Sequence, residues 1–120
     1  MDVQATQLYM AYLDPVFGRE LGGYKPRPVL VVSSSPINRN TRLVIVVPGT
    51  SRGRGTFPNV VEVQPSATNG LETATNFECH QIRAIDQARL MGKSMGRLSR
   101  EDLARVQTAM AYCLWSQSTE

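Results

Sequence analysis

Apolar residues in the first half of the chain form short runs with the length and spacing of β-strands. Residues Leu8 to Leu13 alternate large apolar or aromatic groups with others, and the Asp14-Pro15 pair after them indicates a turn. The segments Pro28 to Ser33 and Arg42 to Val47 are β-branched and apolar on both faces. That composition is typical of strands buried in the centre of a sheet.

Two further strands are predicted after the Pro48-Gly49 pair, which we expect to end the preceding strand. Asn59 to Gln64 alternates with Glu62 on the exposed face, and Phe77 to Ile85 has a mixed alternation that predicts a fifth strand. The segments between the strands are rich in Gly, Pro, Ser or Asn and are expected to be loops: Gly18 to Pro28, Ser34 to Thr41, Thr50 to Gly55 and Pro65 to Thr75.

Near the end of the chain the period changes from that of a strand to that of a helix. Ser99 has the place of an N-cap, with Asp102 three residues later, and the pattern predicts a helix from Ser99 to Trp115. Its apolar stripe consists of Leu103, Val106, Met110, Cys113 and Leu114. This stripe needs an apolar surface to cover, and the five strands offer it. We therefore expect a mainly β, α+β fold, a small curled sheet or barrel with helical cover.

Length and composition favour one domain over residues 1–120, with an ordinary apolar fraction of 42%. The longest apolar runs have the length of strands, so no transmembrane helix is expected. The first residues lack the basic start and apolar stretch of an export signal, which makes the cytoplasm the expected compartment. Cys79 and Cys113 are far apart in sequence, without ligand spacing, and we expect both to be reduced packing residues.

The charged residues argue against a metal site and leave the partner open. A single histidine, His80, and scattered acidic residues do not provide the ligand groups of a metal-dependent nuclease. The net charge is only +3, yet between Arg19 and Arg54 the sole acid is Glu20. The basic residues of this segment are Arg19, Lys25, Arg27, Arg39, Arg42, Arg52 and Arg54. They suit a polyanionic partner, or they are solvated loop residues.

Five motifs in register give the chain a resemblance to a known family. They are YLDPVFGRELGG (Tyr12 to Gly23), RPVLVVS (Arg27 to Ser33), VIVVPGTSRGRG (Val44 to Gly55), QIRAID (Gln81 to Asp86) and GRLSREDLARV (Gly96 to Val106). In this order and spacing they resemble the PemK/MazF toxins of bacterial toxin–antitoxin modules. The resemblance extends from Leu8 to Leu114, which is nearly the whole chain.

The resemblance implies an SH3-like small β-barrel with a C-terminal amphipathic helix, assembled as a homodimer whose groove holds RNA. Members of the family cut single-stranded RNA, mRNA included, at short sequences without a cofactor or a membrane partner. They leave a 2′,3′-cyclic phosphate and a 5′-hydroxyl, and a cognate antitoxin peptide inactivates them by occupying the groove.

The family motifs place catalytic residues at Arg27 of the RPV segment, at Thr50 after the VP pair and at Glu20 of the G-x-E-x-G-G segment. RNA carries its own nucleophile, so the protein needs only to align the 2′-hydroxyl, move protons and stabilise charge on the phosphate. Arg27 offers permanently charged, forked donors for that charge, and Thr50 offers a hydroxyl. If their strands are neighbours, both reach one phosphate.

Two positions depart from the family pattern. Tyr24-Lys25-Pro26 stands where the family usually has one residue, and His80 stands where it commonly has Asp. The general base is therefore either His80, whose intrinsic pKa is close to neutral, or Glu20. The remaining candidates for RNA binding are Arg52, Arg54, Arg39, Arg83, Lys25 and Ser51.

Two other functions compete with RNA cleavage. A gyrase-binding toxin of the CcdB kind shares the barrel but acts through a C-terminal Trp-Gly-Ile, whereas here Trp115 is followed by Ser116 and Gln117. A catalytically inactive relative that only binds RNA or an antitoxin is the other alternative, and a digest of labelled RNA separates it from an enzyme.

Overall fold

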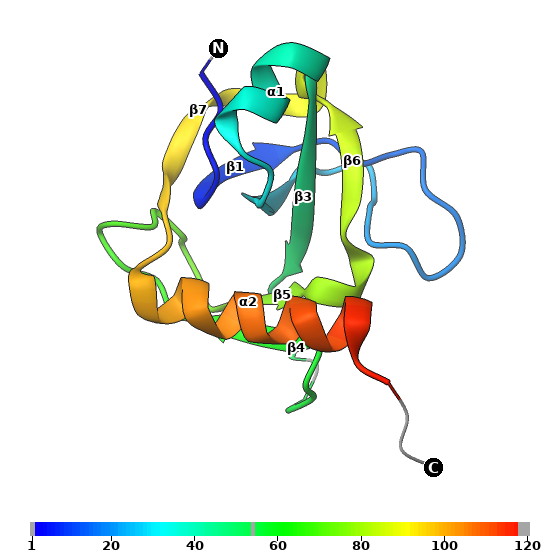
Figure 1. The fold of residues 1–120 in the computed structure, drawn as a ribbon, viewed down its shortest axis with the longest axis vertical. Helices are drawn as coiled ribbons and strands as arrows, with labels where there is room; N and C mark the ends of the chain where they lie inside the picture. The colour runs from blue at the N-terminus through cyan, green and yellow to red at the C-terminus, as the bar shows by residue number, and fades with distance from the viewer. Residues whose placement is uncertain (1, 54, 118–120) are drawn as a thin grey trace.

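The computed structural model describes residues 2–53 and 55–117 and shows a curled antiparallel sheet with a helix across one side (Figure 1). The strands are β1 (Gln7–Ala11), β2 (Arg27–Val31), β3 (Leu43–Thr50), β4 (Val60–Val63), β5 (Thr75–Glu78), β6 (Arg83–Asp86) and β7 (Leu90–Arg97). The helices are α1 (Ser35–Thr41) and α2 (Arg100–Trp115), with 3-10 turns η1 (Cys79–Gln81) and η2 (Gln87–Arg89). The strand order is β4-β5-β3-β2-β1-β7, and β6 also pairs with β3.

The two strands expected to be central are β2 and β3, and each is apolar on both faces for a physical reason. Alternate residues of a strand face opposite sides of a sheet. In β2, Leu30 packs with Phe77 and Val106 in one core, while Val29 and Val31 pack in the other. The mainly β, curled fold with a C-terminal helix is thus confirmed, with seven strands in the described residues rather than five.

The prediction of one continuous strand from Phe77 to Ile85 is wrong. Val46 of β3 pairs with Arg83 in β6, whereas Gly49 of β3 pairs with Phe77 in β5. The step of three residues from Val46 to Gly49 in β3 therefore lies opposite a step of six residues from Phe77 to Arg83. The 3-10 turn η1, between β5 and β6, accommodates the three extra residues. The prediction that Pro48-Gly49 ends the third strand is also wrong, because β3 continues to Thr50, where it pairs with Asn76.

The segment Ser34 to Thr41, expected to be a loop, contains α1. Its Asn38 is 2% exposed, and the amide nitrogen donates to the carbonyl oxygens of Val3 (2.8 Å) and Ser33 (3.1 Å). The backbone NH of Ile45 donates in turn to Ser33 Oγ at 2.9 Å. Polar residues that favour loops are stabilised here as a helix by distant hydrogen-bond partners that a local pattern does not contain.

The helix α2 begins as the sequence predicts, because Ser99 Oγ accepts a hydrogen bond from the backbone NH of Asp102 at 3.1 Å. Val106 and Ala109 are its buried residues. Leu114, predicted on the packed stripe, is 45% exposed. At about 100° per residue it lies about 80° around the helix from Val106, at the edge of the buried face. None of the helices in the described residues has the length and apolar character needed to cross a membrane.

Candidate active site

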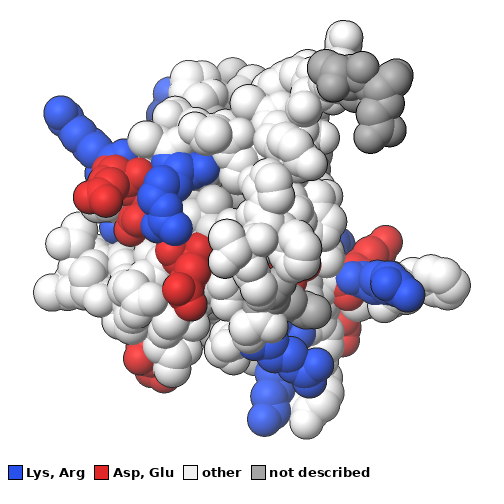
Figure 2. Space-filling model, turned by 90° about the horizontal axis from the view of Figure 1, so that it is seen from below, with Lys and Arg blue, Asp and Glu red and all other residues white. Residues whose placement is uncertain are grey.

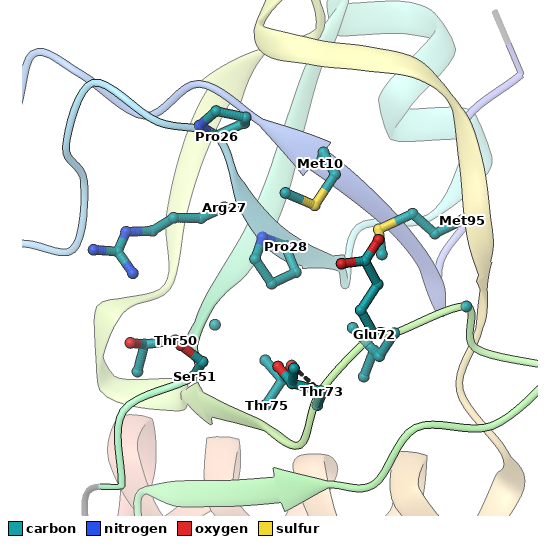
Figure 3. Close-up of a pocket in the computed structure, with 13 residues that line it drawn as sticks. Met10, Pro26, Arg27, Pro28, Thr50, Ser51, Glu72, Thr73, Thr75 and Met95 are labelled. Atoms are coloured by element: carbon teal, nitrogen blue, oxygen red, sulfur yellow. Dashed lines mark hydrogen bonds between the residues drawn. The ribbon is translucent and has the colours of Figure 1, made fainter.

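Arg27 and Thr50 line the same cavity, which has a volume of about 560 Å³. Their strands are antiparallel neighbours, with Val29 of β2 opposite Pro48 of β3. The same register, continued by two residues, puts the first residue of β2 opposite the last residue of β3. Figure 3 shows Arg27, Thr50 and Ser51 together at one end of the cavity. The structure therefore brings together the two residues that the motifs single out.

The backbone of the preceding loop holds the Arg27 side chain. Its Nε donates a hydrogen bond to the carbonyl oxygen of Gly22 at 2.5 Å. The backbone NH of the next residue, Gly23, donates to Asp14 Oδ1 at 2.7 Å, which ties this loop to the segment that follows β1. Because Nε is engaged, the terminal nitrogens of the guanidinium are the donors that remain for a ligand.

Thr50 is 3% exposed and also shapes the loop that follows it. Its Oγ1 accepts a hydrogen bond from the backbone NH of Arg52 at 3.3 Å, and Asn76 Nδ2 donates to the carbonyl oxygen of Arg52 at 2.8 Å. The Thr50 hydroxyl is thus held as an acceptor and still has its own proton to donate. Ser51 lies next to it, exposed, at the cavity.

Glu20 and His80 lie elsewhere, in a second and wider hollow of about 810 Å³ that Arg83 also lines. None of the three is among the residues that line the cavity of Arg27 and Thr50. Glu20 Oε1 accepts a hydrogen bond from the backbone NH of Phe17 at 2.8 Å, which closes the turn between them. The structure thus separates the residues predicted to be catalytic into two groups that line different hollows.

His80 projects from η1, and both of its ring nitrogens have protein neighbours. Nδ1 lies 2.8 Å from Asn59 Nδ2, and Nε2 lies 3.6 Å from Oε1 of Glu78. If the amide nitrogen is the donor, the ring carries its proton on Nε2, toward the buried carboxylate. The side chain is 45% exposed, so the ring can be reached from the solvent.

A sequence profile of the PemK-like, MazF-like toxins of type II toxin–antitoxin systems matches residues 4–114. The chain belongs to this family. Endoribonuclease PemK of Escherichia coli is 34% identical over 114 residues, which cover 91% of this chain and 83% of PemK. Endoribonuclease EndoA of Bacillus subtilis (strain 168) is 34% identical over 115 residues, 95% of this chain and 96% of EndoA.

Solved structures of the PemK/MazF family have the same fold as this chain. A MazF from Deinococcus radiodurans superposes with a TM-score of 0.80 at 25% identity, covering 95% of this chain and 97% of that one. A mycobacterial endoribonuclease, solved in complex with its cognate antitoxin, superposes with a TM-score of 0.73 at 28% identity, covering 93% and 94%. The small β-barrel expected from the motifs is thus the fold of this PemK/MazF family member.

Gln81 ties η1 to the loop that presents Glu20, although the sequence predicted no role for it. Its Oε1 accepts a hydrogen bond from the backbone NH of Leu21 at 2.6 Å, and its Nε2 donates to the carbonyl oxygen of Arg19 at 3.1 Å. Nε2 also donates to Glu78 Oε1 at 3.2 Å. Gln81 therefore fixes the loop that presents Glu20 and, through the carbonyl oxygen of Gly22, holds Arg27. Its only sequence signal was its place at the start of the QIRAID motif.

The other predicted RNA contacts are spread over the molecule. Lys25 is exposed, with its Nζ 6.0 Å from the centre of the Tyr24 ring, and Arg52 is exposed in the loop after β3. Arg39 belongs to α1, where it pairs with Asp2 at 3.9 Å, and does not line the cavity. Arg54 lies outside the described residues. On the face that Figure 2 shows, basic side chains stand in separate groups, some beside acidic ones, around a largely uncharged area.

The two cysteines are free thiols, as expected. Burial, and secondarily the neighbouring Cys113, raises the pKa of Cys79 from 9.0 to about 12. Such a thiol stays protonated at neutral pH and is a poor nucleophile or metal ligand. Among the residues that the structure describes, no three His, Cys, Asp or Glu side chains are grouped so as to hold a metal ion.

Proposed function

We infer that this protein is an endoribonuclease toxin that cleaves single-stranded RNA and is neutralised by a cognate antitoxin. Membership of the PemK/MazF family and the two endoribonuclease relatives support this function. The observation that carries it at the level of residues is the single cavity lined by Arg27 and Thr50. A forked cation and a hydroxyl at adjacent strand ends are suited to grip one phosphodiester.

The proposed reaction uses the 2′-hydroxyl of the substrate as the nucleophile. Its oxygen forms a bond to phosphorus while the bond between phosphorus and the 5′-oxygen breaks. The products are a 2′,3′-cyclic phosphate and a 5′-hydroxyl. The terminal nitrogens of Arg27 stabilise the charge on the non-bridging oxygens, and the Thr50 hydroxyl donates a hydrogen bond to one of them. The reaction needs no cofactor, because the nucleophile and the leaving group both belong to the RNA.

A general base must take the proton from the 2′-hydroxyl. A general acid must give a proton to the leaving 5′-oxygen. Glu20 and His80 are the two candidates, and both line the second hollow. Separate Glu20→Gln and His80→Ala variants distinguish them. The variant that lacks the base should flatten one limb of the dependence of kcat on pH, whereas a structural residue should leave its shape unchanged.

The proposed partners follow from the same function. The solved relative in complex with its cognate antitoxin supports an antitoxin peptide as the inhibitor of this chain. We propose a homodimer as the functional unit, with RNA in the groove that the dimer forms, and the cytoplasm as the compartment where both RNA and antitoxin are present. Lys25, Arg52, Arg54 and Arg83 remain candidates for contacts to the RNA backbone.

The function is tested by incubating the purified protein with a long unstructured RNA and mapping the ends of the products. We expect discrete cleavage sites, 5′ ends that accept a phosphate from a kinase and 3′ ends that are blocked by the cyclic phosphate. Cleavage should persist in excess EDTA. Binding of the RNA without any products would indicate a catalytically inactive relative and would overturn the proposal.

The Arg27→Ala variant tests the role of the guanidinium in the same assay. It should reduce cleavage by at least about 100-fold, because it removes the main donor to the phosphate. The circular dichroism spectrum should remain that of the wild type. Full activity of Arg27→Ala would contradict the role assigned to the guanidinium.

A further inference from the structure

The cavity of Arg27 and Thr50 continues past these two residues to a second end of different chemistry. There its lining includes Met10, Pro28 and Met95, together with one carboxylate, Glu72. Figure 3 shows Glu72 pointing from its loop toward the end of the cavity where the two methionines lie. A single continuous hollow therefore joins a group of phosphate-binding donors to an apolar slot with one anionic acceptor.

The loop that carries Glu72 is tied down just before it by Asn69. The Asn69 side chain is 3% exposed. Its Oδ1 accepts hydrogen bonds from the backbone NH groups of Ser66 (3.0 Å) and Leu71 (2.9 Å), and its Nδ2 donates to the carbonyl oxygen of Gln64 (2.9 Å). A side-chain amide that bonds to the backbone through both its oxygen and its nitrogen holds the loop in one conformation. The backbone that carries Glu72 is thus held in place before any ligand binds.

Two glycines bring this loop against β7. Gly70 has a φ of +71°, and a Cβ there would lie 2.2 Å from the carbonyl oxygen of Met95. Gly96 has a φ of +154°, and a Cβ there would lie 2.1 Å from the carbonyl oxygen of Thr68. Only glycine allows both the positive φ and this approach of two backbones. The close contact places the Glu72 loop directly beside Met95.

We propose that this end of the cavity is a nucleobase pocket that selects guanine next to the cleaved phosphodiester. The proposal rests on the endoribonuclease function inferred above. The thioethers of Met10 and Met95 contact the faces of the base, since sulfur packs well against aromatic rings. The Glu72 carboxylate accepts hydrogen bonds from its Watson–Crick edge.

The choice of guanine follows from counting donors. An ionised carboxylate accepts hydrogen bonds through two oxygens and donates none. Guanine is the base whose Watson–Crick edge presents two adjacent donors, N1–H and the N2 amino group. Uracil, cytosine and adenine each present one donor beside an acceptor, and that acceptor would face the second carboxylate oxygen. Glu72 therefore pairs fully with guanine and repels the lone pairs of the other three bases.

The test measures binding with oligonucleotides that cannot be cleaved. Four fluorescent 2′-O-methyl oligouridines carry guanine, adenine, cytosine or uracil at the central position, and their affinities are compared by anisotropy. We expect the wild type to bind the guanine oligonucleotide roughly 10-fold more tightly than the uracil one, as expected for a bidentate contact. Glu72→Gln, which replaces one acceptor by a donor, should reduce this preference to less than about 2-fold. If the wild type bound all four oligonucleotides with equal affinity, or bound none of them, the proposed guanine pocket would be overturned.

Glu62→Gln is the matched control, because Glu62 is an equally charged, exposed residue of β4 that does not line the cavity. It should keep the guanine preference. If Glu72→Gln does not fold by circular dichroism, Glu72→Ala replaces it with the same expected loss. Cleavage of unmodified RNA by the wild type is measured in parallel. Cleavage without a guanine preference overturns this inference alone, and a guanine preference without cleavage overturns the endoribonuclease function alone.

Discussion

Arg27 and Thr50 line one cavity because they stand at adjacent ends of two neighbouring antiparallel strands, β2 and β3. Neither side chain is a free surface group. Arg27 is held through Nε by the carbonyl oxygen of Gly22 at 2.5 Å, and the Thr50 hydroxyl accepts a hydrogen bond from the backbone NH of Arg52 at 3.3 Å. Donors that are held in place before substrate binds stabilise developing charge without reorganising. Substitutions of Arg27 and of Thr50 should therefore each lower the cleavage rate.

Replacing Arg27 by lysine separates charge from geometry. Arg27→Lys keeps a positive charge at the cavity but loses both the forked donors and the Nε bond to Gly22. We expect kcat for cleavage of an oligoribonucleotide to fall by about 100-fold, because a lysine ammonium is not a substitute where bidentate recognition of phosphate is required. Single-turnover kinetics with saturating enzyme measure this effect.

Arg39→Lys is the control for that substitution, since Arg39 lies on α1 and pairs with Asp2 instead of lining the cavity. Its cleavage rate should stay within about 2-fold of the wild type, because exposed ion pairs contribute little. A rate for Arg27→Lys equal to that of Arg39→Lys would show that positive charge alone is sufficient at position 27.

Thr50 allows the hydroxyl to be removed with little change of shape. Thr50→Val deletes Oγ1, with its bond from Arg52 and its donor to the phosphate, and should lower kcat/KM by roughly 10- to 100-fold. Thr50→Ser keeps the hydroxyl and should stay within about 5-fold of the wild type. The two rates are compared on one oligoribonucleotide. If Thr50→Val cleaved as fast as Thr50→Ser, Thr50 would be a turn residue only.

Asn38 should contribute to stability and not to the cleavage reaction. Asn38→Leu removes the donor to the carbonyl oxygens of Val3 and Ser33 and leaves the Ser33 hydroxyl without its Asn38 partner. We expect the free energy of unfolding to fall by about 2–3 kcal/mol, the cost of leaving buried polar groups unpaired. Urea unfolding gives this value. At a temperature where the variant is folded, its cleavage rate should equal that of the wild type.

Cys79 should make the protein less stable at high pH. Burial, with a smaller contribution from Cys113, raises the pKa of Cys79 from 9.0 to about 12. Between these values the unfolded chain loses the thiol proton while the folded chain keeps it, so the free energy of unfolding decreases as the pH rises. At about pH 10.5 the loss from this group should be about 2 kcal/mol relative to neutral pH.

Cys79→Ala isolates this effect, because the cost of its shortened side chain is the same at both pH values and cancels. Urea unfolding at neutral pH and at about pH 10.5 should show a smaller decrease for the variant than for the wild type, by about 2 kcal/mol. Equal decreases would mean that the Cys79 thiol is not buried as the structure places it.

Elements whose signal is local were predictable from the sequence. The apolar residues of β2 and β3 lie on both faces of those strands because each strand contributes to two cores. The α2 helix was predicted from its start at Ser99, whose hydroxyl caps the backbone NH of Asp102. Leu114 was misplaced because residues at the edge of a helical stripe have the same spacing as those at its centre.

The candidate site was predictable only in part. The family motifs singled out Arg27 and Thr50, and the fold brings them to one cavity. The sequence did not point to Gln81 or Glu72, because Gln81 bonds to a loop distant in sequence and Glu72 lines a cavity formed by several strands and loops. Arg39 stood in a basic segment of the sequence, yet the fold carries it to α1.

The sequence by itself determined the local elements and the family, since both are encoded in residues that are close along the chain: apolar periodicity, a capped helix start and five short motifs in register. Only the tertiary structure decided three features. These are the interruption of the predicted strand Phe77 to Ile85 by η1, the helix within Ser34 to Thr41, and the set of side chains that share a cavity. These features depend on the pairing of strands and on hydrogen bonds between residues far apart in sequence. Such interactions exist only once the chain has folded, and no local pattern contains them.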